Sequence, residues 1–295
     1  MNALVQQFDA DMRLRNLADC TRAQYANCLS VFLRTAPDVD TLTARDIRAF
    51  LTELLDLGRT PSTVRVYGAA LKRWARFTLD RPQLVATLSL PKTRIPNPRP
   101  PLSHADLDAL LRACHGSPLD YTLISLLVGT GLRIREALHL QTRDIDARDG
   151  VLRVRHGKGD RHRTVPVTDR LVRILRRYWT VTQPPGPWLF PARRPGQHGR
   201  RPAPDCFADH PKDTDTARKR IVRRAELAGL SRRVLPHDLR RTFATTLLEA
   251  GTDMALVQVL LGHRCIETTA RYAQVRRQTL DGLRDTLEQL NASHR

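Results

Sequence analysis

A histidine and a tyrosine near the C-terminal end are the first candidates for chemistry. They are His263 and Tyr272, nine residues apart in the stretch LLGHRCIETTARYAQV. On one straight helix they would lie about 13 Å apart along the axis, too far to share a site. Gly262 follows an apolar run, where a helix C-cap usually falls, so we expect the chain to turn there and bring the two together. A buried helix–turn–helix corner would give the same pattern, and this stretch alone leaves both interpretations open.

Two arginines occupy expected helix starts. In HDLRRTFATTLLEAG, His237 and Arg240 lie in the expected first turn of a helix that follows Pro236. A helix N-terminus disfavours a cation, so this arginine indicates that an anion is bound between the two side chains. Arg133 in TGLRIREALHL has a similar place, after a glycine turn and three residues before Glu136. Both arginines suit a phosphate, because the guanidinium group matches its geometry.

Lys158 lies between two glycines in VLRVRHGKGDRHRTVPV, residues 151–167. Polar and apolar residues alternate on both sides of the GKGD turn, which predicts an antiparallel β-hairpin with the lysine at its tip. The glycines would let a bulky ligand approach the backbone closely. A lysine in a turn is most often simply solvated, so Lys158 alone does not indicate a functional site. It becomes a candidate only together with the other residues.

The N-terminal part of the chain is expected to be helical throughout. The stretch TARDIRAFLTELLDLG begins with Thr43 and Asp46, spaced as a capping box, and ends at Gly58. Apolar residues recur at helical spacing in TRAQYANCLSVFLR and in STVRVYGAALKRWARFTL. These patterns predict a bundle of about four helices.

The C-terminal part combines helices with the hairpin. Ser103 and Asp106 form a second capping-box pattern, an apolar helix follows in YTLISLLVG, and helices resume near Thr214. Residues 184–215 are rich in proline, glycine and arginine, which predicts a long surface loop. The expected fold class is therefore mostly α in two domains: an N-terminal helical bundle and a C-terminal α+β domain with a small antiparallel sheet.

A proline-rich segment separates the two parts. LPKTRIPNPRPPLS, residues 90–103, contains five prolines and little to bury, as is typical of a semi-extended linker. We expect domains at 1–89 and 102–295, joined by a linker at 90–101. The net charge is +19, and residues 1–90 hold only 12 of the 49 basic and 9 of the 30 acidic residues. Such an excess on a folded protein indicates a polyanionic partner, above all nucleic acid.

Other features of the composition argue against other classes of protein. The five cysteines form no CxxC pair and are odd in number, which favours a reducing cytoplasm over a disulfide framework. Cys206, His210 and His198 could suggest a zinc site, but coincidence explains three scattered ligands in such a segment better. The N-terminal residues lack the pattern of a signal peptide, and no apolar run approaches the ~20 residues of a membrane span. We expect a cytoplasmic protein with no membrane partner.

Together the motifs resemble those of the tyrosine recombinases, also called phage integrases. The matching pieces are GTGLRIREALHL, the GKG hairpin, HDLRRTFAT, LLGH and the downstream tyrosine, in that order. Each motif alone is weak, but five in order are specific, and the resemblance covers nearly the whole chain. It implies a SAM-like core-binding domain that contacts DNA in residues 1–89, and a catalytic domain in 102–295. Arg241 stands where many members have another histidine.

The resemblance implies a site-specific recombinase that cuts and rejoins DNA through a 3′-phosphotyrosyl intermediate. Tyr272 would be the nucleophile, and Lys158 would donate a proton to the leaving 5′-oxygen. The covalent link keeps the energy of the broken bond, so neither ATP nor a metal ion is needed. No cofactor is expected.

The remaining site residues would act on the phosphate or on the groups that hold it. The resemblance makes Arg133 and Arg240 the phosphate ligands, with His263 as a further hydrogen-bond donor. His237 would act as acid and base, and Glu136 would orient the neighbouring basic groups.

The implied partner is double-stranded DNA with inverted-repeat sites. Recombination needs four strand cleavages, so a homotetramer on two paired sites is the expected assembly. A terminal leucine stripe would dock on a neighbouring protomer in such a ring, although it could also pack on its own domain; it consists of Leu280, Leu283, Leu287 and Leu290. Two rival functions share the pattern: a type IB topoisomerase, which would need no specific inverted repeat, and a DNA-binding relative without catalysis, which the intact matched positions disfavour.

Overall fold

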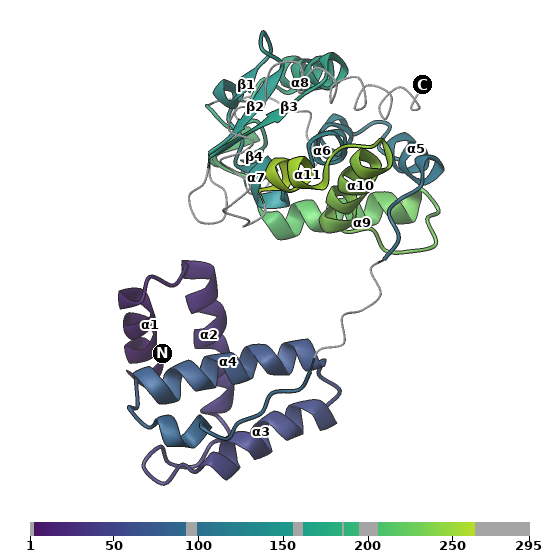
Figure 1. The fold of residues 1–295 in the computed structure, drawn as a ribbon. Helices are drawn as coiled ribbons and strands as arrows, with labels where there is room; N and C mark the ends of the chain where they lie inside the picture. The colour runs from purple at the N-terminus through teal and green to yellow at the C-terminus, as the bar shows by residue number, and fades with distance from the viewer. Residues whose placement is uncertain (1–2, 93–98, 156–161, 185, 195–205, 263–295) are drawn as a thin grey trace. The chain divides into compact units, whose positions relative to one another are not determined.

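The chain divides into two compact units, Met1–Pro98 and Arg99–Arg295 (Figure 1). The computed structural model describes residues 3–92, 99–155, 162–184, 186–194 and 206–262. Each unit has a hydrophobic core of its own. Among the helices of the described ranges, none is both long and apolar enough to cross a membrane.

The first unit is the helical bundle that the sequence predicts. The Thr43 hydroxyl accepts from Asp46 N–H at 3.4 Å, and the Asp46 carboxylate accepts from Thr43 N–H at 2.8 Å, so the predicted capping box starts α3. Phe32 packs edge-on against Phe50 and Trp74 in the core. The elements are α1 (Ala3–Leu14), α2 (Asp19–Phe32), α3 (Ala44–Asp56), α4 (Pro61–Phe77) and the 3-10 helix η1 (Pro82–Val85).

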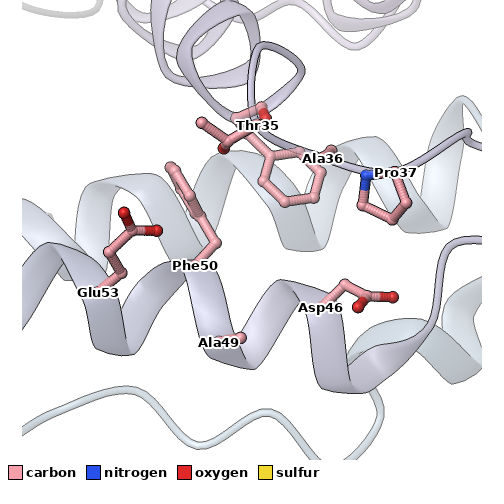
Figure 2. A pocket seen from close by; sticks show the side chains of 8 residues that line it. Thr35, Ala36, Pro37, Asp46, Ala49, Phe50 and Glu53 are labelled. Carbon is pink, nitrogen blue, oxygen red and sulfur yellow. The ribbon is translucent and has the colours of Figure 1, made fainter.

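A hollow of about 340 Å³ opens in this unit between the end of α2 and α3 (Figure 2). Phe50 and the chain at residues 35–37 line it, together with the carboxylate-bearing residues Asp46 and Glu53 of α3. No basic side chain lines the hollow. It therefore offers no cation for a phosphate.

The second unit combines helices with two small antiparallel sheets, in agreement with the predicted fold class. The sheets are β1 (Ile145–Asp146), β2 (Val151–Val154) and β3 (Arg163–Pro166), in that order, and β4 (Pro191–Arg193) paired with β5 (Phe207–Pro211). The helices are α5 (His104–Arg112), α6 (Pro118–Thr130), α7 (Ile134–Leu138), η2 (Thr142–Asp144), α8 (Asp169–Thr182), α9 (Thr214–Leu227), α10 (Pro236–Glu249) and α11 (Met254–Leu261).

Helix α6 is the central helix of this unit. Its apolar sequence buries every residue from 122 to 130, and α8 and α10 pack against it (Figure 1). Gly131 ends the helix in the left-handed conformation, with φ at 61°. Burial on all sides is typical of a helix at the middle of a domain, so α6 fixes the helices that carry the candidate residues.

The structure confirms the predicted hairpin and corrects the predicted loop. Strands β2 and β3 pair antiparallel, with Val154 opposite Arg163 at the end of the ladder nearest the turn. The prediction of a surface loop over 184–215 is wrong in part, because β4 and β5 form a second hairpin there. These strands have only three and five residues, too few for a clear alternation, and prolines at their ends resemble loop signals. Phe207 of β5 and Phe190, which directly precedes β4, are buried.

Candidate active site

Three arginines meet at the C-terminal end of α11. Gly262 caps the helix in the left-handed conformation (φ 66°), as its sequence predicts. The last carbonyl groups of a helix have no partner within it, and the helix dipole favours cations there. The carbonyl oxygens of Leu260, Leu261 and Gly262 accept hydrogen bonds from Arg163 Nε at 2.8 Å, Arg240 Nη2 at 2.6 Å and Arg133 Nη2 at 3.4 Å, respectively.

Arg240 is almost completely buried, with 4% of its surface exposed. It is the fifth residue of α10, so the predicted place in the first turn is wrong. Its Nη1 also donates to Gly131 O at 2.7 Å, which puts the guanidinium between the C-terminal ends of α6 and α11. Two helix ends thus stabilise a cation that the sequence analysis judged unfavourable. Burial, and next the charge of Arg133, lower the pKa of Arg240 to about 10 against the opposing effect of Glu136, so it remains charged at neutral pH.

The start of α10 is fixed by Asp238, whose buried carboxylate accepts from Leu235 N–H at 2.8 Å. Thr242, one turn later, donates to the Asp238 carbonyl at 3.0 Å and accepts from Leu102 N–H at 2.9 Å. These bonds tie the beginning of the second unit to α10. His237 is the second residue of the helix and is exposed. Its ring is therefore accessible to a ligand at the helix N-terminus.

Arg133 directly precedes α7 and is held by Glu136 in that helix. The buried Glu136 carboxylate accepts from Arg133 N–H at 2.8 Å through Oε2 and from Arg133 Nη1 at 2.8 Å through Oε1. The Arg133 side chain is 35% exposed, against 10% for that of Arg163. Arg133 therefore has donors that remain accessible to an anion.

Arg163, the first residue of β3, is the member of this cluster that was not predicted from the sequence. Its Nη1 and Nη2 donate to the two oxygens of Glu136 at 2.9 and 2.7 Å. Burial favours a raised pKa for Glu136, but the hydrogen bonds and charge of Arg163, followed by the hydrogen bonds of Arg133, outweigh it and lower the pKa to about 2. A signal exists in the sequence: Arg163 shares a strand face with the fully buried Val165, and a charge on a buried face needs a partner.

Three predicted site residues, Lys158, His263 and Tyr272, lie outside the described residues. In the chain, Lys158 falls between β2 and β3, five residues before Arg163, and His263 directly follows Gly262. Of the predicted residues inside the described part, Arg133 and Arg240 both donate to carbonyl groups at the end of α11, and Glu136 binds Arg133. His237 lies in the first turn of the helix that carries Arg240.

The cluster has three guanidinium groups and one carboxylate, so it carries excess positive charge around four backbone carbonyls. Such an arrangement suits a phosphate group, because preorganised donors bind its oxygens without a metal ion. Within the described residues, no group of three His, Cys, Asp or Glu side chains could hold a metal ion. Of the weighed zinc ligands, Cys206 is buried and His210 is exposed on β5, while His198 lies outside the described residues.

Comparisons with known proteins agree with the fold. The model of the phage integrase family matches residues 101–279, and that of the phage integrase N-terminal SAM-like domain matches residues 4–84. The chain is 35% identical over 296 residues to the tyrosine recombinase XerD of Yersinia pestis, covering 93% of each protein.

Solved structures show the same fold. A lambda integrase dimer bound to a core site aligns with a TM-score of 0.70 at 20% identity, over 89% of this chain and 94% of that one. A lambda integrase tetramer bound to a Holliday junction aligns with the same TM-score, over 89% of this chain and 77% of that one. The two family models together span most of the sequence, and the XerD relative matches nearly all of it. The chain therefore belongs to the phage integrase family and is a site-specific tyrosine recombinase that acts on DNA.

Proposed function

We propose that Tyr272 attacks a DNA phosphate held by Arg133 and Arg240, forming a 3′-phosphotyrosyl link and releasing a 5′-hydroxyl. The observation that carries this proposal is the cluster of arginines on the end of α11. The chain continues from that end through His263 to Tyr272. A phosphate bound by these arginines would therefore lie next to the segment that carries the nucleophile.

The chemistry follows from the charges of the site. In-line attack on a phosphodiester builds negative charge on its equatorial oxygens, which fixed cationic donors stabilise. Arg133 supplies exposed donors, and the buried Arg240 stays charged because helix ends surround it. These arginines take the role that a metal ion has in other phosphoryl-transfer sites, so no metal or cofactor enters the proposal. The phosphotyrosyl bond conserves the energy of the broken bond, so ATP is not required either.

Proton transfers complete the proposed reaction. Lys158 donates a proton to the leaving 5′-oxygen, and His237 at the exposed start of α10 acts as acid and base for the tyrosine hydroxyl. His263 donates a hydrogen bond to the phosphate. Glu136 keeps the arginines in place and does not touch DNA.

The test is covalent capture on a suicide DNA substrate, resolved on a denaturing gel. We expect Tyr272→Phe to abolish the protein–DNA adduct and to leave DNA binding intact, because only the nucleophilic oxygen is lost. Tyr121→Phe, which removes a hydroxyl from α6, is the control and should form the adduct normally. Adduct formation should persist in EDTA. An undiminished adduct from Tyr272→Phe, or a strict need for Mg²⁺, would overturn the proposal.

We also propose that the partner is duplex DNA with inverted repeats and that four protomers act on two paired sites. The lambda integrase tetramer on a Holliday junction supports this assembly. Removal of the residues after Ala273, which include the terminal leucine stripe, should leave single-site binding intact but prevent tetramers and strand exchange. Mass photometry on two-site DNA measures this, and a truncated protein that still recombines would exclude the role of the stripe. Because the substrate is DNA, we also propose that the protein acts in the cytoplasm, with the nucleoid.

A further inference from the structure

We propose that Arg163 is a positioning residue for DNA cleavage, acting through Glu136 and the end of α11. The inference rests on the proposed function, because it concerns the same phosphate site. It goes beyond that function by naming a residue that need not touch DNA and yet sets the cleavage rate.

The contacts of Arg163 join three segments that are distant in the sequence. The residue itself begins β3, at the base of the hairpin whose turn contains Lys158. Its two terminal nitrogens hold both oxygens of Glu136 on α7, and its Nε holds Leu260 O at the end of α11. The guanidinium therefore uses all three of its nitrogens on protein partners.

The end of α11 is shaped to receive this guanidinium. Gly262 has a φ of 66°, and a Cβ on it would lie 3.1 Å from Arg163 Nη1 and 3.3 Å from Arg163 Cζ. A side chain at this position would press on the guanidinium and strain the backbone. The glycine thus allows the last carbonyls of α11 to approach Arg163, and His263 follows it directly in the chain.

Glu136 transmits the effect of Arg163 to Arg133. Each Glu136 oxygen is shared: Oε1 accepts from Arg133 Nη1 and Arg163 Nη1, and Oε2 accepts from Arg133 N–H and Arg163 Nη2. Without Arg163 the carboxylate would be held by Arg133 alone, so the orientation of the Glu136–Arg133 pair would be less fixed. A misplacement of about 1 Å in a catalytic group can slow a reaction about 100-fold.

A second ion pair in the same unit supplies a matched control. The buried Asp120 accepts from Arg220 through both oxygens, at 2.5 and 2.9 Å, and also from Arg224 at 2.6 Å. Arg163→Met and Arg220→Met therefore make similar changes, and each also removes one further hydrogen bond, to Leu260 O and to Ser117 Oγ, respectively. Each removes a two-point guanidinium contact from a buried carboxylate that retains one other arginine.

The experiment measures the melting temperature, the DNA affinity and the single-turnover cleavage rate of each protein. Cleavage is measured with saturating protein, at a temperature well below the melting temperature of the least stable variant. We expect both variants to have a lower melting temperature than the wild type and to bind DNA with the same affinity. Only Arg163→Met should cleave slowly, by about 100-fold, with Arg163→Lys between it and the wild type. Glu136→Gln combined with Arg163→Met should be slowed by less than the product of the two single effects, because both act through one contact.

Two outcomes would overturn the inference: Arg163→Met cleaving at the wild-type rate, or Arg220→Met being slowed as much. Should Arg163→Met not fold, Arg163→Lys is compared with Arg220→Lys by the same criteria. The wild type and Tyr272→Phe are run alongside. Absence of a covalent adduct from the wild type would count against the proposed function, whereas a normal adduct with an unaffected Arg163→Met would count against Arg163 alone.

Discussion

At the scale of single residues, the burial of Arg240 determines what a conservative change would do. We expect Arg240→Lys to lower the free energy of unfolding by about 2 kcal/mol, because one ammonium cannot span the carbonyls of Gly131 and Leu261 as the guanidinium does. Cleavage should fall about 100-fold, as when one donor to a developing oxyanion is removed. Urea unfolding and suicide-substrate cleavage measure the two effects.

Its neighbour in the chain supplies the control for this prediction. Arg241 makes an exposed hydrogen bond to Arg99 O at 2.7 Å. Arg241→Lys should therefore change stability by less than about 0.5 kcal/mol. Equal losses of stability and cleavage in the two lysine variants would contradict the special position of Arg240.

At the scale of elements, the junction of α6, α10 and α11 depends on the glycine that ends α6. A Cβ on Gly131 would overlap the Phe243 ring of α10 and lie 3.0 Å from the Leu261 side chain of α11. Gly131→Ala should cost about 3 kcal/mol, from overpacking in addition to left-handed strain, and should slow cleavage by moving the carbonyl that holds Arg240.

A change at Gly116 distinguishes the cost of left-handed backbone strain from the cost of overpacking. It also has a positive φ, of 79°, but nothing lies within 4 Å of the position of its Cβ. Gly116→Ala should therefore cost only about 1 kcal/mol and leave cleavage unchanged. Thermal unfolding of the two variants checks the difference, and similar losses would show that packing at the junction is not decisive.

At the scale of the whole molecule, the charge of +19 sets how binding depends on salt. The logarithm of the binding constant should fall with the logarithm of the salt concentration, at about 0.9 per neutralised phosphate. If the first unit makes phosphate contacts of its own, removal of residues 1–98 should flatten this slope. Fluorescence anisotropy over a salt series measures both slopes; identical slopes would mean that the first unit does not contact the DNA backbone.

The sequence by itself determined the features whose signals are local. The capping boxes at Thr43 and Ser103, the glycine cap at Gly262 and the β2–β3 hairpin each depend on residues only a few positions apart, and the structure has all of them. The identity of the candidate site residues also came from short motifs. Local hydrogen bonds and backbone preferences suffice to fix such features.

Only the tertiary structure decided how those residues support one another. It showed that Arg163 binds Glu136, that two helix-end carbonyl groups hold Arg240, and that β4 and β5 form a hairpin within a proline-rich stretch. Three of the bonds that hold the arginines join residues 97, 109 and 129 positions apart. Such contacts leave no periodic trace in the sequence, because a carbonyl acceptor belongs to every residue type and its availability depends on where a helix ends in space.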